Sequence, residues 1–371
     1  MFSQGKRHTW DIANLILKGG WRWTYGGSAP DRGHTAAPTA EQLYDQFKLS
    51  YTIRNLANCY QRGKGWWDEK EFEATVAPTL RDLAANQPRG YDRVYKVLHE
   101  SRSSDTMLRR FSDLLGGEPY DMPEKEKANV DAQFENVVKY CRAIKKADPN
   151  AKICLINDYP GVGVEYMKRG FPKDAFDYFG SEMANFMREP ERQPDWLCLL
   201  GLTRQWALAK EKYGYQDKPV WTTEALYHAT NPANLSLHAQ AVIQNREAML
   251  ALANGIERMA AAGCIRDVTD DYRWSNWGQV GFCFREPEIN PKPSYAMYAW
   301  LTQLLDQYKF AGHVAADSSS LHILDFAKPN AAHVYPVWCV RGQQTVTLTV
   351  EGGAPTVYDA YGNTMPATVQ N

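Results

Sequence analysis

The stretch KPVWTTEALYH, residues 218–228, decides the fold and raises the functional question. Its first half predicts a buried strand, because Val220 and Trp221 are strong strand formers and two β-branched threonines follow them. The strand then ends on Glu224. Burial of an unpaired charge is costly, so Glu224 is either the first residue of a solvated loop or a carboxylate held there for chemistry.

Helix and strand signals alternate with short connections from about Glu124 onward, which predicts a parallel sheet wrapped by helices. We expect helices in segments 124–150, 197–215, 236–263 and 291–310, and strands in segments 151–158, 176–179, 218–224 and 264–274. These units correspond to units five to eight of a (β/α)8 TIM barrel, a fold that takes roughly 250 residues. The first 105 residues must supply the first three units, and TIRNLANCY (52–60) is their best strand candidate.

The sequence changes its pattern after about His313. SLHILDFAK, AHVYPVWCV, QQTVTLTV and PTVYDAY alternate at period two between turn residues, which is typical of antiparallel strands. We therefore expect a catalytic barrel over 1–312 and a small, truncated antiparallel β-sandwich module over 313–371.

Composition excludes several kinds of partner. Lysine and arginine total 42 against 43 acidic residues, so the net charge of -1 favours a neutral ligand over nucleic acid or an anionic membrane. The seven cysteines include no CxxC pair, and the histidines lack metal-ligand spacing, so no metal is expected. No nucleotide-binding motif follows a strand, hence no cofactor is expected. No signal peptide or membrane-spanning run is visible in this chain.

A second carboxylate occurs in DLLGGEPYD, residues 113–121, where two leucines precede Gly116, Gly117 and Glu118. This pattern predicts Glu118 at the end of the fourth strand of the barrel. Carboxylates on strands four and seven would face each other across the barrel mouth, as glycoside hydrolysis requires. One would protonate the leaving oxygen, and the other would attack the anomeric carbon.

Five segments carry a family resemblance. KPVWTTE, GGEPYD, DPNAKI, ALANGIERM and GFCFREPEINPKPSYAMYAW resemble the retaining glycoside hydrolases of clan A over residues 116–305, and VYDAYGN resembles the β-sandwich that follows such barrels. The resemblance implies that Glu118 is the acid/base and Glu224 the nucleophile. It also implies that Arg22, in WRWTYGGSAPD, is a substrate-binding residue at the turn after strand two. The family usually has Asn where this chain has Gly117.

Aromatic residues complete the expected site. The resemblance suggests Tyr178 on strand six as a substrate-binding residue, and Tyr272, Trp274 or Trp277 on strand eight could form a floor beneath the sugar. Structural interpretations compete with each assignment: Glu224 as a cap, Glu118 as a solvated turn residue, and Arg22 as a salt-bridge residue. Trp66 and Trp67 are either a sugar platform or packing residues at the edge of the fold, and packing is favoured.

The sequence therefore predicts a retaining glycosidase that hydrolyses a cell-wall polysaccharide or an oligosaccharide from one. One alternative is a catalytically decayed barrel that only binds carbohydrate, and another is a structural cell-surface module. The resemblance implies a secreted or periplasmic protein, and the sequence leaves its oligomeric state open.

Overall fold

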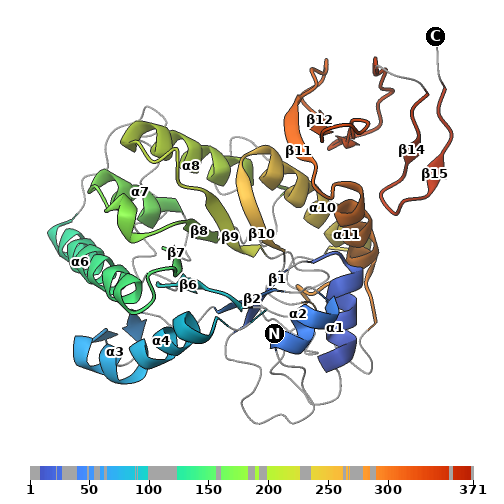
Figure 1. Ribbon diagram of the computed structural model, residues 1–371. Coiled ribbons are helices and arrows are strands. Elements are labelled where there is room, and N and C mark those ends of the chain that lie inside the picture. Colours follow the sequence, from blue (N-terminus) through green and yellow to red (C-terminus); the bar gives the residue numbers. More distant parts are fainter. Residues whose placement is uncertain are drawn as a thin grey trace.

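The computed structural model shows a mixed α/β fold (Figure 1). The residues that it describes are 9–21, 23–26, 40–47, 50–53, 59–61, 65–87, 89, 91–98, 123–155, 160–182, 189–191, 199–225, 235–261, 265, 267, 279–284, 290–350 and 354–368.

Helices flank the strands through most of the described chain. They are α1 (Thr9–Lys18), α2 (Ala40–Phe47), α3 (Glu69–Thr75), α4 (Ala77–Asn86), α6 (Glu124–Ala147), α7 (Pro160–Lys168), the 3-10 helix η1 (Lys173–Ala175), α8 (Leu199–Tyr213), α10 (Leu237–Ala253) and α11 (Pro293–Leu304). No helix in the described ranges is both long enough and apolar enough to cross a membrane.

The strands fall into a parallel set and a C-terminal antiparallel set. The first set and a short hairpin comprise β1 (Trp23–Gly26), β2 (Ser50–Ile53), β3 (Tyr60–Gln61), β4 (Gly65–Trp66), β5 (Tyr91–Asp92), β6 (Val94–Lys96), β7 (Lys152–Cys154), β8 (Phe179–Glu182), β9 (Val220–Ala225) and β10 (Ile256–Ala261). The second set is β11 (Lys309–His313), β12 (Leu321–Ala327), β13 (Val337–Cys339), β14 (Val357–Tyr358) and β15 (Thr364–Met365).

The parallel strands follow one another in chain order. The pairs β1–β2, β2–β5, β6–β7, β8–β9 and β9–β10 are all parallel. Only Arg93 separates β5 from β6, and a parallel bridge between Cys154 and Tyr178 joins β7 to β8. This order, with helices between successive strands, is consistent with a TIM barrel.

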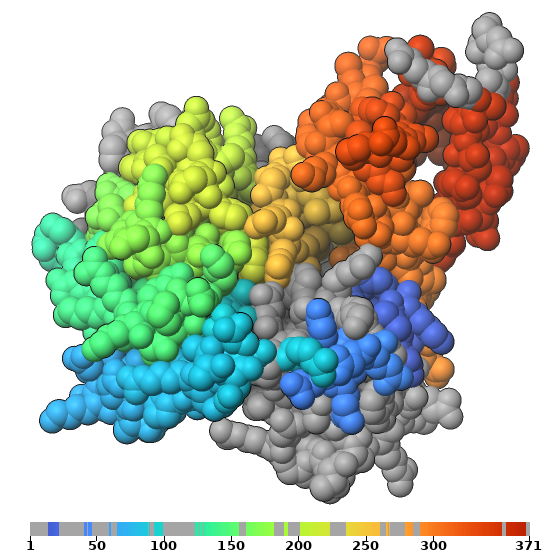
Figure 2. Space-filling model, in the orientation of Figure 1, coloured from blue at the N-terminus to red at the C-terminus, as the bar shows by residue number. Residues whose placement is uncertain are grey.

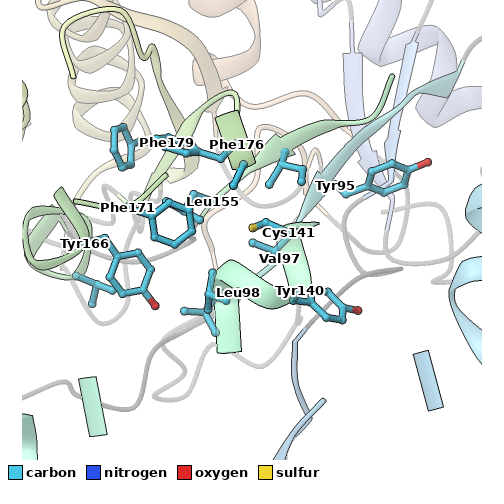
Figure 3. Close-up of a cluster of buried hydrophobic side chains, with 14 of the residues drawn as sticks. Tyr95, Val97, Leu98, Tyr140, Cys141, Leu155, Tyr166, Phe171, Phe176 and Phe179 are labelled. Carbon is cyan, nitrogen blue, oxygen red and sulfur yellow. The ribbon is translucent and has the colours of Figure 1, made fainter. Parts of the chain in front are cut away.

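Side chains alternate between two apolar layers along these strands, as period-two geometry requires. Tyr95, Ile153 and Val220 belong to a large cluster that the helices cover, whereas their neighbours Val94, Cys154 and Trp221 form a separate cluster with Tyr178. Within the large cluster the ring of Phe176 contacts the rings of both Phe171 and Phe179 (Figure 3). The strands therefore carry apolar side chains on both faces, which is typical of a parallel sheet.

Several predicted elements are confirmed. Helix α6 begins at Glu124 and ends before Asp148, and α8 is followed by Gly214 in the left-handed conformation (φ +78°) that glycine favours at helix ends. The predicted strands near 151–158 and 218–224 are found as β7 and β9, whereas β8 (Phe179–Glu182) shares only Phe179 with the strand expected at 176–179. Helix α11 begins at Pro293, two residues later than the proline expected to open it.

The helix expected over 236–263 is wrong after Ala253. Helix α10 starts at its N-cap Ser236 but ends at Ala253, where Asn254 and Gly255 (φ +79°) terminate it. Residues Ile256–Ala261 instead form β10, hydrogen-bonded to β9. Pairing with β9 outweighs the helical propensity of this alanine-rich segment. Within the strand expected over 264–274, only Ile265 and Asp267 are described, and neither is in a strand.

The C-terminal region forms a lobe at one side of the molecule (Figure 2). Strands β11, β12 and β13 form an antiparallel sheet, and β14 and β15 form a separate hairpin. This sheet begins at Lys309, slightly before the expected boundary. The strand expected at 343–350 is absent, although the structure describes all eight residues. The structure thus shows antiparallel pairs without establishing the predicted sandwich.

The aromatic pair of the N-terminal region has a packing role. Trp66 makes an edge contact with Tyr60, and Trp67 packs on Phe72 and Tyr140 while its Nε1 donates to the Asn136 carbonyl at 3.2 Å. The structural interpretation of these tryptophans is therefore the better supported. Strand β2 (Ser50–Ile53) overlaps only the start of TIRNLANCY.

Candidate active site

The carboxyl ends of the parallel strands define the candidate site. Strands β6, β7, β8, β9 and β10 end at Lys96, Cys154, Glu182, Ala225 and Ala261. Because parallel strands point the same way, these ends lie at one edge of the sheet, and the strand-to-helix connections begin there. In α/β barrels this edge carries the functional residues.

Glu224 is the fifth residue of β9, as its sequence predicts. Val220, Trp221 and Thr222, at the start of this strand, are each at most 2% exposed, so its first half is buried. A register shift occurs just before Glu224, whose Cα partner on β8 is Glu182. The structure describes the backbone position of Glu224 in β9 and not its side chain.

Glu182 is a second carboxylate at this edge that the sequence analysis did not single out. It ends β8 as Glu224 nearly ends β9, and neighbouring strands lie roughly 4.8 Å apart. The available signal was the parallel between FGSE and WTTE, two strand-forming segments that both finish on glutamate. The edge therefore brings two glutamates into register on adjacent strands.

The structure does not test the expected strand position of Glu118, because residues 99–122 are outside the part of the chain that it describes. The strand that is hydrogen-bonded to β7 is β6, in the register Val94 to Lys152 and Lys96 to Cys154. Buried Val97 and Leu98 continue β6, and the first carboxylate after them in the sequence is Glu100. Glu118 itself lies outside the described residues, and its catalytic role stays a prediction.

Arg22, Tyr272, Trp274 and Trp277 also lie outside the described residues, so their binding roles stay predictions. The strand that follows Arg22 is present as β1.

Tyr178 lies at the opposite end of the strands from Glu224. It immediately precedes β8, and its ring stacks on Trp221 with centroids 3.9 Å apart. The Arg258 guanidinium lies 4.4 Å from the centroid of the Trp221 ring, and Trp221 Nε1 donates to Glu257 at 3.0 Å. Burial raises the pKa of the Tyr178 hydroxyl, and the Glu257 charge adds to this effect. Tyr178 thus packs against the cluster of Val94, Cys154 and Trp221, and its substrate-binding role stays a prediction.

A buried cation lies at the carboxyl end of β6. Lys96 is 5% exposed and is the register partner of Cys154. Burial raises the pKa of the Cys154 thiol to about 12, and the charge of Lys96 offsets only part of that effect. The thiol is therefore neutral at physiological pH and unsuited to nucleophilic catalysis.

Two buried ion pairs hold connections that start at this edge. Lys292 Nζ donates to Asp267 Oδ1 at 2.6 Å, and the Gly281 N–H donates to the same oxygen at 2.9 Å, within the β10–α11 connection. In the β8–α8 connection, Glu191 accepts from Arg246 Nε of α10 at 2.6 Å. Both pairs are almost fully buried, which fixes these connections against the helices.

Among the residues that the structure describes, no group of three His, Cys, Asp or Glu side chains could hold a metal ion. The described cysteines Cys59, Cys141, Cys154, Cys283 and Cys339 are free thiols.

Comparisons with known proteins agree with the fold. No family model matches the sequence, and no curated protein matches it. Among solved structures, a family 39 glycoside hydrolase from the gut symbiont Bacteroides cellulosilyticus WH2 is similar, with a TM-score of 0.65 at 16% identity, covering 97% of this chain and 74% of that one. Bacteroides uniformis β-glucuronidase 2 is similar with a TM-score of 0.55 at 10% identity, covering 91% of this chain and 43% of that one.

A third similar structure is the family 30 subfamily 8 xylanase Xyn30A from Clostridium acetobutylicum. Its TM-score is 0.52 at 10% identity, and the match covers 86% of this chain and 74% of that chain. The chain thus shares its fold with glycoside hydrolases. The resemblance that the sequence motifs predict is confirmed at the level of the fold.

Proposed function

We propose that the protein is a retaining glycoside hydrolase built on a (β/α)8 barrel over residues 1–312, followed by a partial β-sandwich over 313–371. The observation that carries the proposal is the buried strand β9, which delivers Glu224 to the carboxyl edge of a parallel sheet. The shared fold with glycoside hydrolases supports it. A cell-wall polysaccharide or an oligosaccharide from one is the proposed substrate.

The proposed chemistry is a double displacement. The ionised carboxylate of Glu224 attacks the anomeric carbon while a protonated carboxylic acid gives its proton to the leaving glycosidic oxygen. This first step breaks the carbon–oxygen bond and leaves a covalent glycosyl ester on Glu224. The second residue, now ionised, takes a proton from water, whose oxygen attacks the same carbon and releases Glu224.

Three glutamates are candidates for the acid/base role. The motif resemblance assigns it to Glu118. Strand order favours Glu100, because β6 is the strand three places before β9 in the parallel series, and Glu100 is the first carboxylate that follows it in the sequence. Glu182, the register partner of Glu224 on β8, is the third candidate.

A screen of aryl glycosides tests the proposal, with Glu224→Gln as the deciding variant. We expect turnover of at least one glycoside and a loss of several powers of ten in Glu224→Gln, because an amide cannot form the covalent intermediate. Glu211→Gln, on the exposed side of α8, is the matched control and should keep wild-type activity. Retention of more than roughly a tenth of the activity in Glu224→Gln would exclude the nucleophile assignment.

The second candidate function is carbohydrate binding without turnover. It is favoured by Gly117, which stands where the family usually has Asn before its acid/base. Binding of oligosaccharides with no hydrolysis of any aryl glycoside would support this function and overturn the first.

A further inference from the structure

A cavity of about 490 Å³ opens on the outer face of α11, which lies between α1 and the β14–β15 hairpin (Figure 1). Its volume is within the range of small-molecule sites, roughly 300–1,000 Å³. The lining includes Lys18 at the end of α1 and Tyr361 in the hairpin turn. It also includes Trp300 and Gln303 of α11, and Asp306 just after α11 ends. Three segments far apart in the sequence therefore meet around one hollow.

Two glycines allow the walls of the cavity to approach each other. Thr302 Oγ1 donates to the Gly19 carbonyl oxygen at 2.8 Å. A Cβ added to Gly20 would lie 2.3 Å from Thr302 Oγ1. A Cβ on Gly362 would lie 2.8 Å from the Trp300 ring, and Gly362 has a left-handed φ of +89°. The end of α1 and the hairpin turn therefore pack against α11 at Gly20 and Gly362, where only glycine fits.

Tyr361 is fixed in place although it remains exposed. Its N–H donates to Asp359 Oδ1 at 2.8 Å, and its hydroxyl lies 3.3 Å from His238 Nδ1 of α10. Its exposed fraction is 39%. Trp300 is held by the ring of Tyr358, with centroids 5.1 Å apart. A ligand would therefore meet two preordered aromatic rings and lose little entropy in organising them.

The lining chemistry suits a neutral, amphipathic ligand. Trp300 and Tyr361 offer ring surface to apolar C–H faces, while Gln303, Asp306 and Lys18 offer donors and acceptors to hydroxyl groups. Lys18 and Asp306 carry opposite charges, so the cavity does not select for an anion or a cation. A sugar ring has apolar faces and a rim of hydroxyl groups, which matches this combination.

The cavity is distinct from the carboxyl edge of the sheet. Lys18 ends α1 and Gly20 lies in the connection from α1 to β1, which enters the amino end of β1. The remaining lining residues lie on α11, just after its C-terminal end and in the hairpin turn. No lining residue belongs to a connection that follows β6, β7, β8, β9 or β10.

We infer that this cavity is a second, non-catalytic carbohydrate-binding site that takes a neutral sugar unit of a glycan between Trp300 and Tyr361. The inference rests on the proposed function for the identity of the ligand class. The site would hold the protein on a polysaccharide while the candidate active site, at the carboxyl edge of the sheet, acts on another part of the same polysaccharide.

Affinity electrophoresis of the full chain tests this site, in gels that contain soluble xylan, galactomannan or mixed-linkage β-glucan. We expect at least one polysaccharide to retard the wild-type protein and Glu224→Gln equally. Tyr361→Ala and Gln303→Ala should each weaken the apparent affinity about tenfold, because each removes one class of contact. Tyr335→Ala, an aromatic change in the same lobe but outside the cavity, should migrate like the wild type.

Aryl glycoside hydrolysis by the same variants separates this inference from the proposed function. If retardation is lost in Tyr361→Ala and Gln303→Ala, the second site stands whether or not any glycoside is hydrolysed. The inference is overturned if hydrolysis occurs with no retardation by any polysaccharide, or if both variants are retarded like the wild type. The circular dichroism spectrum of each variant should match that of the wild type. A loss of retardation then reports lost binding and not unfolding.

Discussion

At the residue scale, the sequence predicts the strand ending on Glu224 correctly because every signal there is local. Val220, Trp221 and Thr222 combine strand propensity with full burial, and pairing on both sides keeps them in place. The strand beside β7 was not predictable in the same way, because in VYKVLHE a buried Lys96 interrupts the apolar pattern of β6.

Replacing each candidate acid/base by alanine distinguishes Glu100, Glu118 and Glu182. A general acid matters most when the leaving group is poor, because an activated aryl oxygen departs without a proton. We expect Glu100→Ala to lose natural glycoside hydrolysis by roughly 10²–10⁴-fold while keeping a burst on dinitrophenyl glycosides. Azide should restore its second step and give a glycosyl azide of retained configuration.

Glu118→Ala and Glu182→Ala serve as matched comparisons for that experiment. If azide rescue occurs in Glu118→Ala instead, the motif resemblance identifies the acid/base and the strand order misleads. An equal loss for all leaving groups in Glu100→Ala, with no rescue, would assign Glu100 a structural role.

At the element scale, helices with strong end signals were predictable and the strand after α10 was not. Asp148 after α6 and Gly214 after α8 stop their helices as the sequence indicates. Residues 256–261 read as helix because IERMAA has high helical propensity, and only the hydrogen bonds to β9 make it a strand. Such long-range pairing is not visible in a local pattern.

The carboxylate of Asp177, in the connection between η1 and β8, binds residues of α6 and of β7. Asp177 accepts from Lys145 of α6 at 2.8 Å, from the Ile153 N–H at 2.9 Å and from Lys152 at 3.1 Å. Burial acts to raise the pKa of Asp177, but these hydrogen bonds outweigh it and hold the pKa below its usual value of 3.8. The ionised carboxylate of Asp177 therefore makes its full contribution to the free energy of unfolding above pH 3.8. That contribution is lost as the pH falls through the lowered pKa of Asp177.

Asp177→Asn tests this link. At neutral pH we expect the variant to be destabilised by roughly 1–3 kcal/mol, because three donors lose a charged acceptor. The difference in thermal midpoint from the wild type should shrink as the pH is lowered below about 4. Asp174→Asn, an exposed change in η1, is the control and should follow the wild type at each pH. A pH-independent difference would mean that the charge of Asp177 contributes nothing.

At the scale of the whole molecule, the C-terminal lobe was predictable from its period-two pattern, but its attachment was not. Glu191 accepts from Arg246 of α10 and, through Oε1, from Trp338 Nε1 of β13 at 2.8 Å. Leu324 and Phe326 pack with Leu305 in one buried cluster between the lobe and the helices. Neither contact has a sequence signature, because each joins residues distant in the chain.

Glu191, Arg246 and Trp338 form what we call the Glu191 cluster, which links the lobe to the α/β body. We therefore expect the lobe and the body to unfold together. Arg246→Met leaves the buried Glu191 carboxylate without its cation, so we expect a destabilisation of about 3–5 kcal/mol. Trp338→Phe removes only one donor to that carboxylate and should cost about 1.5–3 kcal/mol. Val337→Thr, at an exposed neighbour in β13, should be almost neutral.

Urea unfolding followed by circular dichroism checks this order. In the wild type we expect one transition, and in Arg246→Met a second transition at lower urea, since the lobe loses its polar anchor and keeps only the Leu305 cluster. If Arg246→Met unfolds at the wild-type midpoint, the buried pair contributes no net stability. If the wild type already shows two transitions, the lobe folds independently, and the Glu191 cluster orders the β8–α8 connection without joining the two parts into one cooperative unit.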